Sequence, residues 1–252
     1  MSHDTAFEKP VSPGQLKEIM ATLMQAIPAE LSSEDAQRII ENKKWLIGEV
    51  QDLFTLRKLL LAQWVEFYRE VLPLHMIDVD FSALKIPKRR RGFDRLIVVA
   101  HGLTLKGVIT AAQKYFPVDF HEPWKYFYGV EETRGTHDRV PSKPYAVWVR
   151  DQADPDTEYT DIPARLLKQR GVQGITLLEH LLFNLKTFTE TGTLLDRNAT
   201  RTYCFGSRDS GGAVPVVFAG DRRAGKSLYV TCRWYLNHGF SVREVIAQFK
   251  FN

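Results

Sequence analysis

The stretch that most constrains the fold of this chain is Pro215–Val230, an apolar run followed by G-x-x-x-x-G-K-S at Gly220–Ser227. A motif of this kind binds nucleotide phosphates when a helix follows it and points its positive end at the anion. Residues Leu228–Tyr235 are instead rich in β-branched and aromatic side chains with a period of two, which favours a strand. We therefore expect a β-hairpin turn at Gly220–Ser227 rather than an ATP or GTP site.

The first 75 residues have the pattern of a helical region. Leu16, Ile19 and Leu23 recur on one stripe of a helix. Ser32–Ser33, followed by two acidic residues, predicts the start of a second helix. A third helix is expected from about Lys44 to Leu72, where a proline follows. These helices are the candidates for contact with a second copy of the chain or with another protein.

The pattern changes at Met76, after which short apolar runs alternate with turns. The runs predict strands at Met76–Phe81, Leu96–Ala100 and Tyr145–Arg150, and a helix at Thr104–Phe116. Residues 119–143 are rich in Gly, Pro, His and charge, and predict a long irregular loop. We therefore expect an α+β domain over residues 76–252.

A capping box opens the best-defined helix of this domain. Thr176 can accept a hydrogen bond from the backbone N–H of residue 179, while Glu179 reaches back to the N–H of residue 176. Leucines at 177, 178, 181, 182 and 185 give the helix a buried side, and Gly192 is placed to end it.

The C-terminal quarter has the period of strands. Apolar runs at Thr202–Phe205, Val214–Phe218, Leu228–Trp234 and Phe240–Val245 are joined by turns rich in Gly and Asp. They predict an antiparallel β meander.

Composition limits the classes of function. The net charge of +4 is too small and too dispersed to require an anionic partner, and no apolar run is long enough to cross a bilayer. No signal-like leader is present, so a soluble, cytoplasmic protein is expected. Cys204 and Cys232 lack neighbouring ligands at zinc spacing and are expected to be buried thiols. We find no catalytic set, metal cluster or cofactor motif, and interpret Glu131–Glu132 and the acidic stretch Asp151–Asp161 as exposed loop carboxylates.

A basic run supplies the main alternative function. Lys88, Arg89, Arg90 and Arg91 are consecutive and could bind a phosphate backbone through the release of counterions. The alternative is a nucleic-acid- or nucleotide-binding protein that uses this run and the P-loop-like stretch 220–227. A solvated loop before the strand at Leu96 explains the run equally well.

A second motif is similar to a serine-protease signature. Asp209-Ser210-Gly211-Gly212 has the residues found around a trypsin-like nucleophile, and His101 lies upstream. A triad is defined by geometry, and the strands before His101 are too few for a double barrel. A polar turn in the meander is the simpler interpretation.

The segment Gly206–Val242 has an unusual composition. It contains no Glu, Gln or Met and one Lys, while Gly, Ser, Arg, Asp, Ala, Val, Tyr and Asn together make up most of it. Tyr, Ser, Gly, Asn and Arg are the residues of adaptable binding surfaces. Because only one face of a meander strand must be apolar, alternate and turn positions are available for binding. The candidate ligand-binding residues are Arg208, Asp209, Ser210, Asp221, Arg222, Tyr229, Arg233, Tyr235, Asn237 and His238.

These strands resemble those of a known fold. Tyr203–Ser207, Val214–Phe218, Leu228–Tyr235 and the ending Gly239-Phe-Ser-Val-Arg243 are similar to the last strands of C-type-lectin-fold domains. The chain resembles in particular the variable proteins of diversity-generating retroelements, which close with a related Gly-Phe-x-x-Arg segment. Residues 86–100 and 174–179 resemble uncharacterised bacterial proteins with this kind of C-terminus, so the resemblance covers residues 86–246.

The resemblance implies a lectin-like scaffold with a diversified face that binds a macromolecule, most simply a protein, and no enzymatic activity. Retroelements of this kind mutate template adenines, which yields most residues except Glu, Gln, Met, Lys and Trp. The depletion in residues 206–242 fits that rule except at Lys226 and Trp234. A paired calcium-ligand motif is absent from the sequence, so calcium-dependent sugar binding is not expected.

Overall fold

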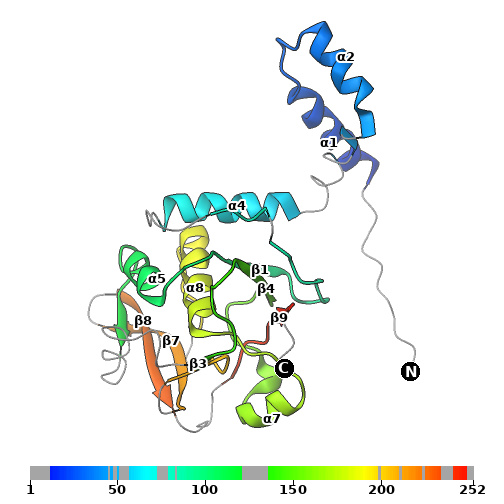
Figure 1. The fold of residues 1–252 in the computed structure, drawn as a ribbon. Coiled ribbons are helices and arrows are strands. Elements are labelled where there is room, and N and C mark those ends of the chain that lie inside the picture. Colours follow the sequence, from blue (N-terminus) through cyan, green and yellow to red (C-terminus); the bar gives the residue numbers. More distant parts are fainter. Residues whose placement is uncertain are drawn as a thin grey trace. The chain divides into compact units, whose positions relative to one another are not determined.

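The computed structural model describes residues 12–44, 46–47, 50, 57–72, 79–82, 84–120, 136–197, 200–209, 212–222, 225–233 and 241–248 (Figure 1). Contacts divide the chain into two compact units, residues 1–58 and 59–252. The division precedes the predicted boundary after residue 75, because the second half of the third predicted helix, from residue 59 on, belongs to the second unit. Within the described residues, no helix is long and apolar enough to cross a membrane.

The first unit contains two of the predicted helices. α1 (Pro13–Gln25) begins with a capping box between Ser12 and Gln15, and α2 (Ser33–Glu41) begins with Ser32 accepting a hydrogen bond from the N–H of Asp35. Both helices are therefore confirmed. Neither has a buried residue, and apolar side chains such as Met24 stay exposed.

An antiparallel sheet of β1 (Arg95–Val99), β4 (Tyr145–Val149) and β9 (Ile246–Ala247) forms one layer of the second unit. Helix α4 (Arg57–Glu70) lies along β1, with Trp64 Nε1 donating to Leu96 O at 3.1 Å and Tyr68 Oη donating to Val98 O at 2.8 Å. These bonds occupy carbonyls of an edge strand that would otherwise lack partners. The strands predicted at 96–100 and 145–150 are confirmed, whereas residues 79–82 are not in a strand and 76–78 lie outside the described residues.

Helix α8 (Leu177–Thr191) lies at the centre of this unit (Figure 1). The predicted capping box forms, and Gly192 ends the helix in a left-handed conformation with φ 68°. The α8 leucines share one apolar cluster with β1, β4 and part of the C-terminal sheet. The predicted helix α5 (Leu105–Ala112), capped by Thr104, packs beside α8.

The C-terminal strands form a sheet in the order β2 (Val118–Phe120), β8 (Gly225–Arg233), β7 (Val214–Arg222) and β5 (Thr202–Tyr203). β5, β7 and β8 pair antiparallel as predicted, but β2 joins β8 in parallel, so the sheet is mixed. The sequence pattern did not predict this pairing, because β2 is only three residues long and directly precedes the long predicted loop. The remaining elements are the strands β3 (Thr136–His137) and β6 (Ser207–Arg208), which pair with each other, and the short helices η1 (Thr157–Tyr159) and α7 (Ala164–Gln169).

The predicted strand at 240–245 does not extend the meander. Ser241, Val242 and Glu244 make isolated bridges to Thr202, Asp156 and Gly174, and β9 then joins the other sheet. This last segment therefore connects parts of the unit that are far apart in the sequence.

Candidate binding surface and the buried network beside it

The P-loop-like stretch lies in the β7–β8 hairpin. The two strands pair from Val214 with Arg233 to Arg222 with Gly225, and β8 continues through residues 226–233 as predicted. Because a strand follows Lys226, the motif lacks the helix whose positive end faces the phosphates in a P-loop. A Cβ atom at Gly220 would approach the Tyr229 ring to 3.1 Å, which gives this glycine a packing role.

Both faces of the hairpin are largely covered. One face, with Val217, Leu228 and Val230, belongs to the main apolar cluster, while Val214 and Val216 on the other face pack in a second cluster that includes residues of α7. The expectation that alternate strand positions are open to a ligand is therefore wrong for these residues. What remains half-buried is an aromatic stack of Phe218 on Tyr229, with ring centroids 5.2 Å apart and the Arg201 guanidinium over Phe218 at 4.8 Å.

The candidate residues divide between the two ends of the hairpin. Arg233 pairs with Val214 and thus lies at the end where the segment carrying Arg208 and Asp209 enters β7. Asp221 and Arg222 lie at the opposite end, about 25 Å away for strands of this length. The structure gives only the backbone of Asp221, Arg222 and Arg233, and Ser210, Tyr235, Asn237 and His238 lie outside the described residues.

Arg208 and Asp209 are engaged by their own turn. Asp209 Oδ1 accepts from the Ala213 N–H at 2.8 Å, and Arg208 Nη1 donates to Phe205 O and Ser207 O at 2.5 and 2.8 Å. Burial lowers the pKa of Arg208 below its ordinary value. These two side chains are therefore held by local hydrogen bonds just before β7. Residues 210–211 lie outside the described residues.

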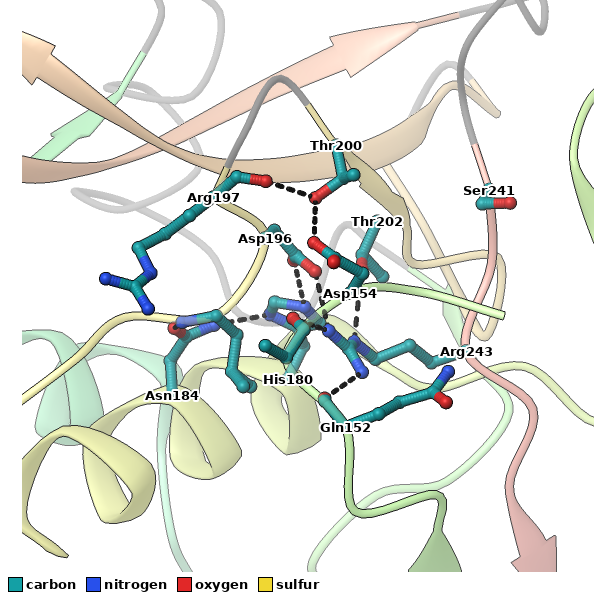
Figure 2. A network of polar contacts seen from close by, with 12 residues as sticks. Gln152, Asp154, His180, Asn184, Asp196, Arg197, Thr200, Thr202, Ser241 and Arg243 are labelled. Atoms are coloured by element: carbon teal, nitrogen blue, oxygen red, sulfur yellow. Dashed lines mark hydrogen bonds and ion pairs between the residues drawn. The ribbon is translucent and has the colours of Figure 1, made fainter. Parts of the chain in front are cut away.

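A buried polar network lies beside this hairpin (Figure 2). Asp196 Oδ2 is 2.7 Å from His180 Nε2, and Asp196 Oδ1 accepts from Arg243 Nη2 at 2.7 Å. Asn184 Oδ1 accepts from the Leu195 N–H, so its amide nitrogen donates to His180 Nδ1 at 3.1 Å. This places the imidazole proton on Nε2, facing Asp196.

The charges of the network follow from burial and pairing. Burial acts to raise the pKa of Asp196, but Arg243 and His180 outweigh it and hold that pKa below its ordinary value. Burial also lowers the pKa of His180, against the influence of Asp196, and keeps the imidazole neutral. The side chains of His180, Asp196 and Arg243 are 2% exposed or less, so the arrangement has no access for a substrate.

The network fixes both boundaries of the Gly206–Val242 segment. Arg243 Nε donates to Thr202 Oγ1 at 3.2 Å, while Nη1 and Nη2 donate to the carbonyls of Gln152 and Ala153. The backbone carbonyl of Asp196 accepts from the Ala219 N–H of β7. The sequence patterns did not identify His180, Asp196 and Arg243 as a network. Two features of the sequence could have indicated it: a histidine among the leucines of α8, and the arginine of the Gly-Phe-x-x-Arg ending.

The basic run enters a second ionic cluster. Arg90 Nη2 lies 2.5 Å from Glu244 Oε2, and its guanidinium covers the Phe93 ring at 4.1 Å. Arg89 lies 3.5 Å from the carboxylate of Asp94. All four residues are exposed, and the charges of two of them, Arg89 and Arg90, are thus opposed by carboxylates. This reduces the footprint that the run offers to a phosphate backbone.

Asp156 corrects the expectation of exposed acidic loops. It is 1% exposed, its Oδ2 forms an ion pair with Arg150 Nη1 at 2.6 Å, and the same oxygen accepts from the Glu244 N–H at 2.6 Å. Burial raises the pKa of Asp156 to about 6, although the Glu244 N–H and Arg150 favour the charged form. The residue therefore holds the last segment of the chain in place. Glu131–Glu132 lie outside the described residues.

The described part of the chain contains no group of three or more His, Cys, Asp or Glu residues that could hold a metal ion. Cys204 is buried and Cys232 is half-buried, and both are free thiols. Searches with family models, among curated proteins and among solved structures find no match to this chain.

Proposed function

We propose that this chain is a non-enzymatic ligand-binding protein with a diversified surface at the end of the hairpin where β7 begins and β8 ends. Asp209 and Ala213, which are hydrogen bonded to each other, lie at this end beside Arg233, the last described residue of β8. The composition of residues 206–242 supports the proposal, since Tyr, Ser, Gly, Asn and Arg suit contacts with a protein ligand.

One observation carries the proposal: the segment is held at both boundaries by residues of one buried network. Thr202 precedes it and Arg243 follows it, and the two side chains are hydrogen bonded to each other. A scaffold fixed in this way can accept changes in the intervening turns without losing its core. This is the property that a C-type-lectin-like variable protein of a diversity-generating retroelement would need.

The proposal is tested by sequencing the 3′ end of the gene from many cells of one source population. We expect substitutions concentrated in the codons of residues 209–212 and 233–238, at positions that are adenines in a near-copy of the gene end beside a reverse-transcriptase gene. The codons of Thr202, Asp196 and Arg243 serve as the internal control and should stay constant. Equal variation in both sets, or none in either, would contradict a diversified surface.

A further inference from the structure

A pocket of about 330 Å³ lies between the first turns of α5 and α8 and the segment 137–142. Leu103, Leu105, Val140 and Leu178 give it an apolar wall. Its polar groups are few and include His137 and Arg139. A pocket of this size, apolar with a small number of polar groups, has the character of a small-molecule site.

Arg139 makes its hydrogen bonds to the described residues through Nε and Nη2. Its side chain is 4% exposed, Nε and Nη2 donate to the two oxygens of Glu179 at 2.6 and 2.8 Å, and Nη2 also donates to Gly174 O at 2.6 Å. Among the described residues, Nη1 makes no hydrogen bond. Because the guanidinium is planar, Nη1 lies on the edge away from Glu179.

The surroundings of Arg139 select the charge of a ligand. Arg139 is neutralised by Glu179, so the pocket offers directed N–H donors without a large excess of positive charge. The N-termini of α5 and α8 both border the pocket and favour a single negative charge there. An adjoining pocket of about 260 Å³ shares Arg139 but contains Asp138, which would repel an anion.

We propose that this pocket binds a small carboxylate with an apolar body, with the carboxylate on Arg139 Nη1 and the body against Leu103, Leu105 and Leu178. A carboxylate accepts from a guanidinium through strong, charge-assisted hydrogen bonds. None of the candidate ligand-binding residues whose side chains the structure describes lines this pocket, so the pocket is argued independently of the proposed function.

Sodium octanoate, titrated calorimetrically into the full chain below its micelle-forming concentration, is the probe. We expect saturable binding, and an affinity for the neutral octanamide about 10-fold to 100-fold weaker, because a hydrogen bond to a charged acceptor is stronger than one to a neutral acceptor. Equal affinities for the two compounds, or no binding of octanoate, would overturn the proposal.

Two variants locate the site. Leu178→Trp fills the pocket and should abolish octanoate binding, whereas Leu166→Trp, a matched change on exposed α7, should leave it unchanged. The double variant Arg139→Gln with Glu179→Gln removes both charges together and keeps a capping-box residue, and should weaken octanoate binding about 10-fold to 100-fold. Wild-type affinity in folded Leu178→Trp would place octanoate elsewhere and refute the site. If either variant does not fold, the other variant and the comparison with octanamide decide whether octanoate binds in this pocket.

Discussion

Replacing Asp196 by Asn tests whether the buried network holds the C-terminal segment. Asp196 has a left-handed backbone with φ 54°, a conformation that Asn also tolerates, so the change affects the charge and not the chain path. The Asn amide oxygen can still accept from Arg243 Nη2, but the amide nitrogen then faces the Nε2–H of His180. His180 cannot change tautomer without facing the amide nitrogen of Asn184, which is fixed by Leu195.

The expected cost combines two losses. Arg243, almost fully buried, loses the charge of its partner but keeps three neutral acceptors, which lowers stability by about 1.5 to 3 kcal/mol. The new amide nitrogen and the Nε2–H of His180 are both donors and face each other, which lowers the free energy of unfolding by about 1 to 3 kcal/mol more. We therefore expect Asp196→Asn to lower the free energy of unfolding by about 3 to 5 kcal/mol, the range found when one partner of a buried pair is removed.

Urea unfolding, followed by circular dichroism and by tryptophan fluorescence, measures this loss. The control is Asp151→Asn, the same substitution at an exposed residue, which should change stability by less than about 0.5 kcal/mol. Combining Asp196→Asn with Arg243→Met in a double-mutant cycle should give a coupling of at least about 1.5 kcal/mol. If the two changes are additive, or if Asp196→Asn costs no more than its control, the network does not carry the role assigned to it.

Three further predictions concern separate parts of the molecule. The folded pKa of Asp156, about 6, lies above its ordinary value, so its stabilising contribution is complete below the unfolded pKa and is lost as the pH rises through 6. The stability of wild type relative to Asp156→Asn should therefore fall by about 2 kcal/mol between pH 4 and pH 7, as urea unfolding at several pH values can measure; a constant difference would refute the assignment. Gly206→Ala would bring a Cβ atom to 2.5 Å from the backbone oxygen of Gly174, and should lower the melting temperature far more than Gly220→Ala, which meets a side chain at 3.1 Å. Similar melting temperatures for the two variants would show that the backbone near Gly206 moves to accommodate a Cβ atom at little cost in stability. Lys226→Ala should not alter the response to Mg²⁺-ATP in a nucleotide titration, and a saturable signal in wild type that the variant lacks would restore the P-loop hypothesis.

Local chemistry made part of the fold predictable. The capping box at Thr176 and the glycine at 192 act within one or two helical turns, and both form as expected. The strand after Lys226 was predictable for the same reason, since its residue types favour an extended chain whatever packs on it.

Long-range partners were beyond the sequence patterns. The parallel pairing of Val118–Phe120 with β8 joins residues more than a hundred positions apart, and no local signal encodes it. Asp156 and Asp196 have the sequence surroundings of loop residues, yet both are buried where Glu244 and Arg243 reach them from a distant part of the chain. The alternation rule failed on the hairpin because α7 and its neighbours cover the face that a simple meander would leave in solvent.

The two ionic clusters are anchored by consecutive residues of one short segment. Arg243 points to Asp196, and Glu244 pairs with Arg90, while the Glu244 N–H binds Asp156. Apolar residues at these positions could provide similar stability, since burying charges is costly. Apolar residues would not, however, fix which neighbouring groups this segment contacts, because apolar contacts lack direction. The donors of Arg243 reach four separate acceptors and fit one arrangement. The proposed function requires residues 243–244 to pack in one arrangement whatever the sequence of the turns before them, and directional hydrogen bonds provide this. The coupling free energy between Asp196 and Arg243 measures how much one of these contacts contributes.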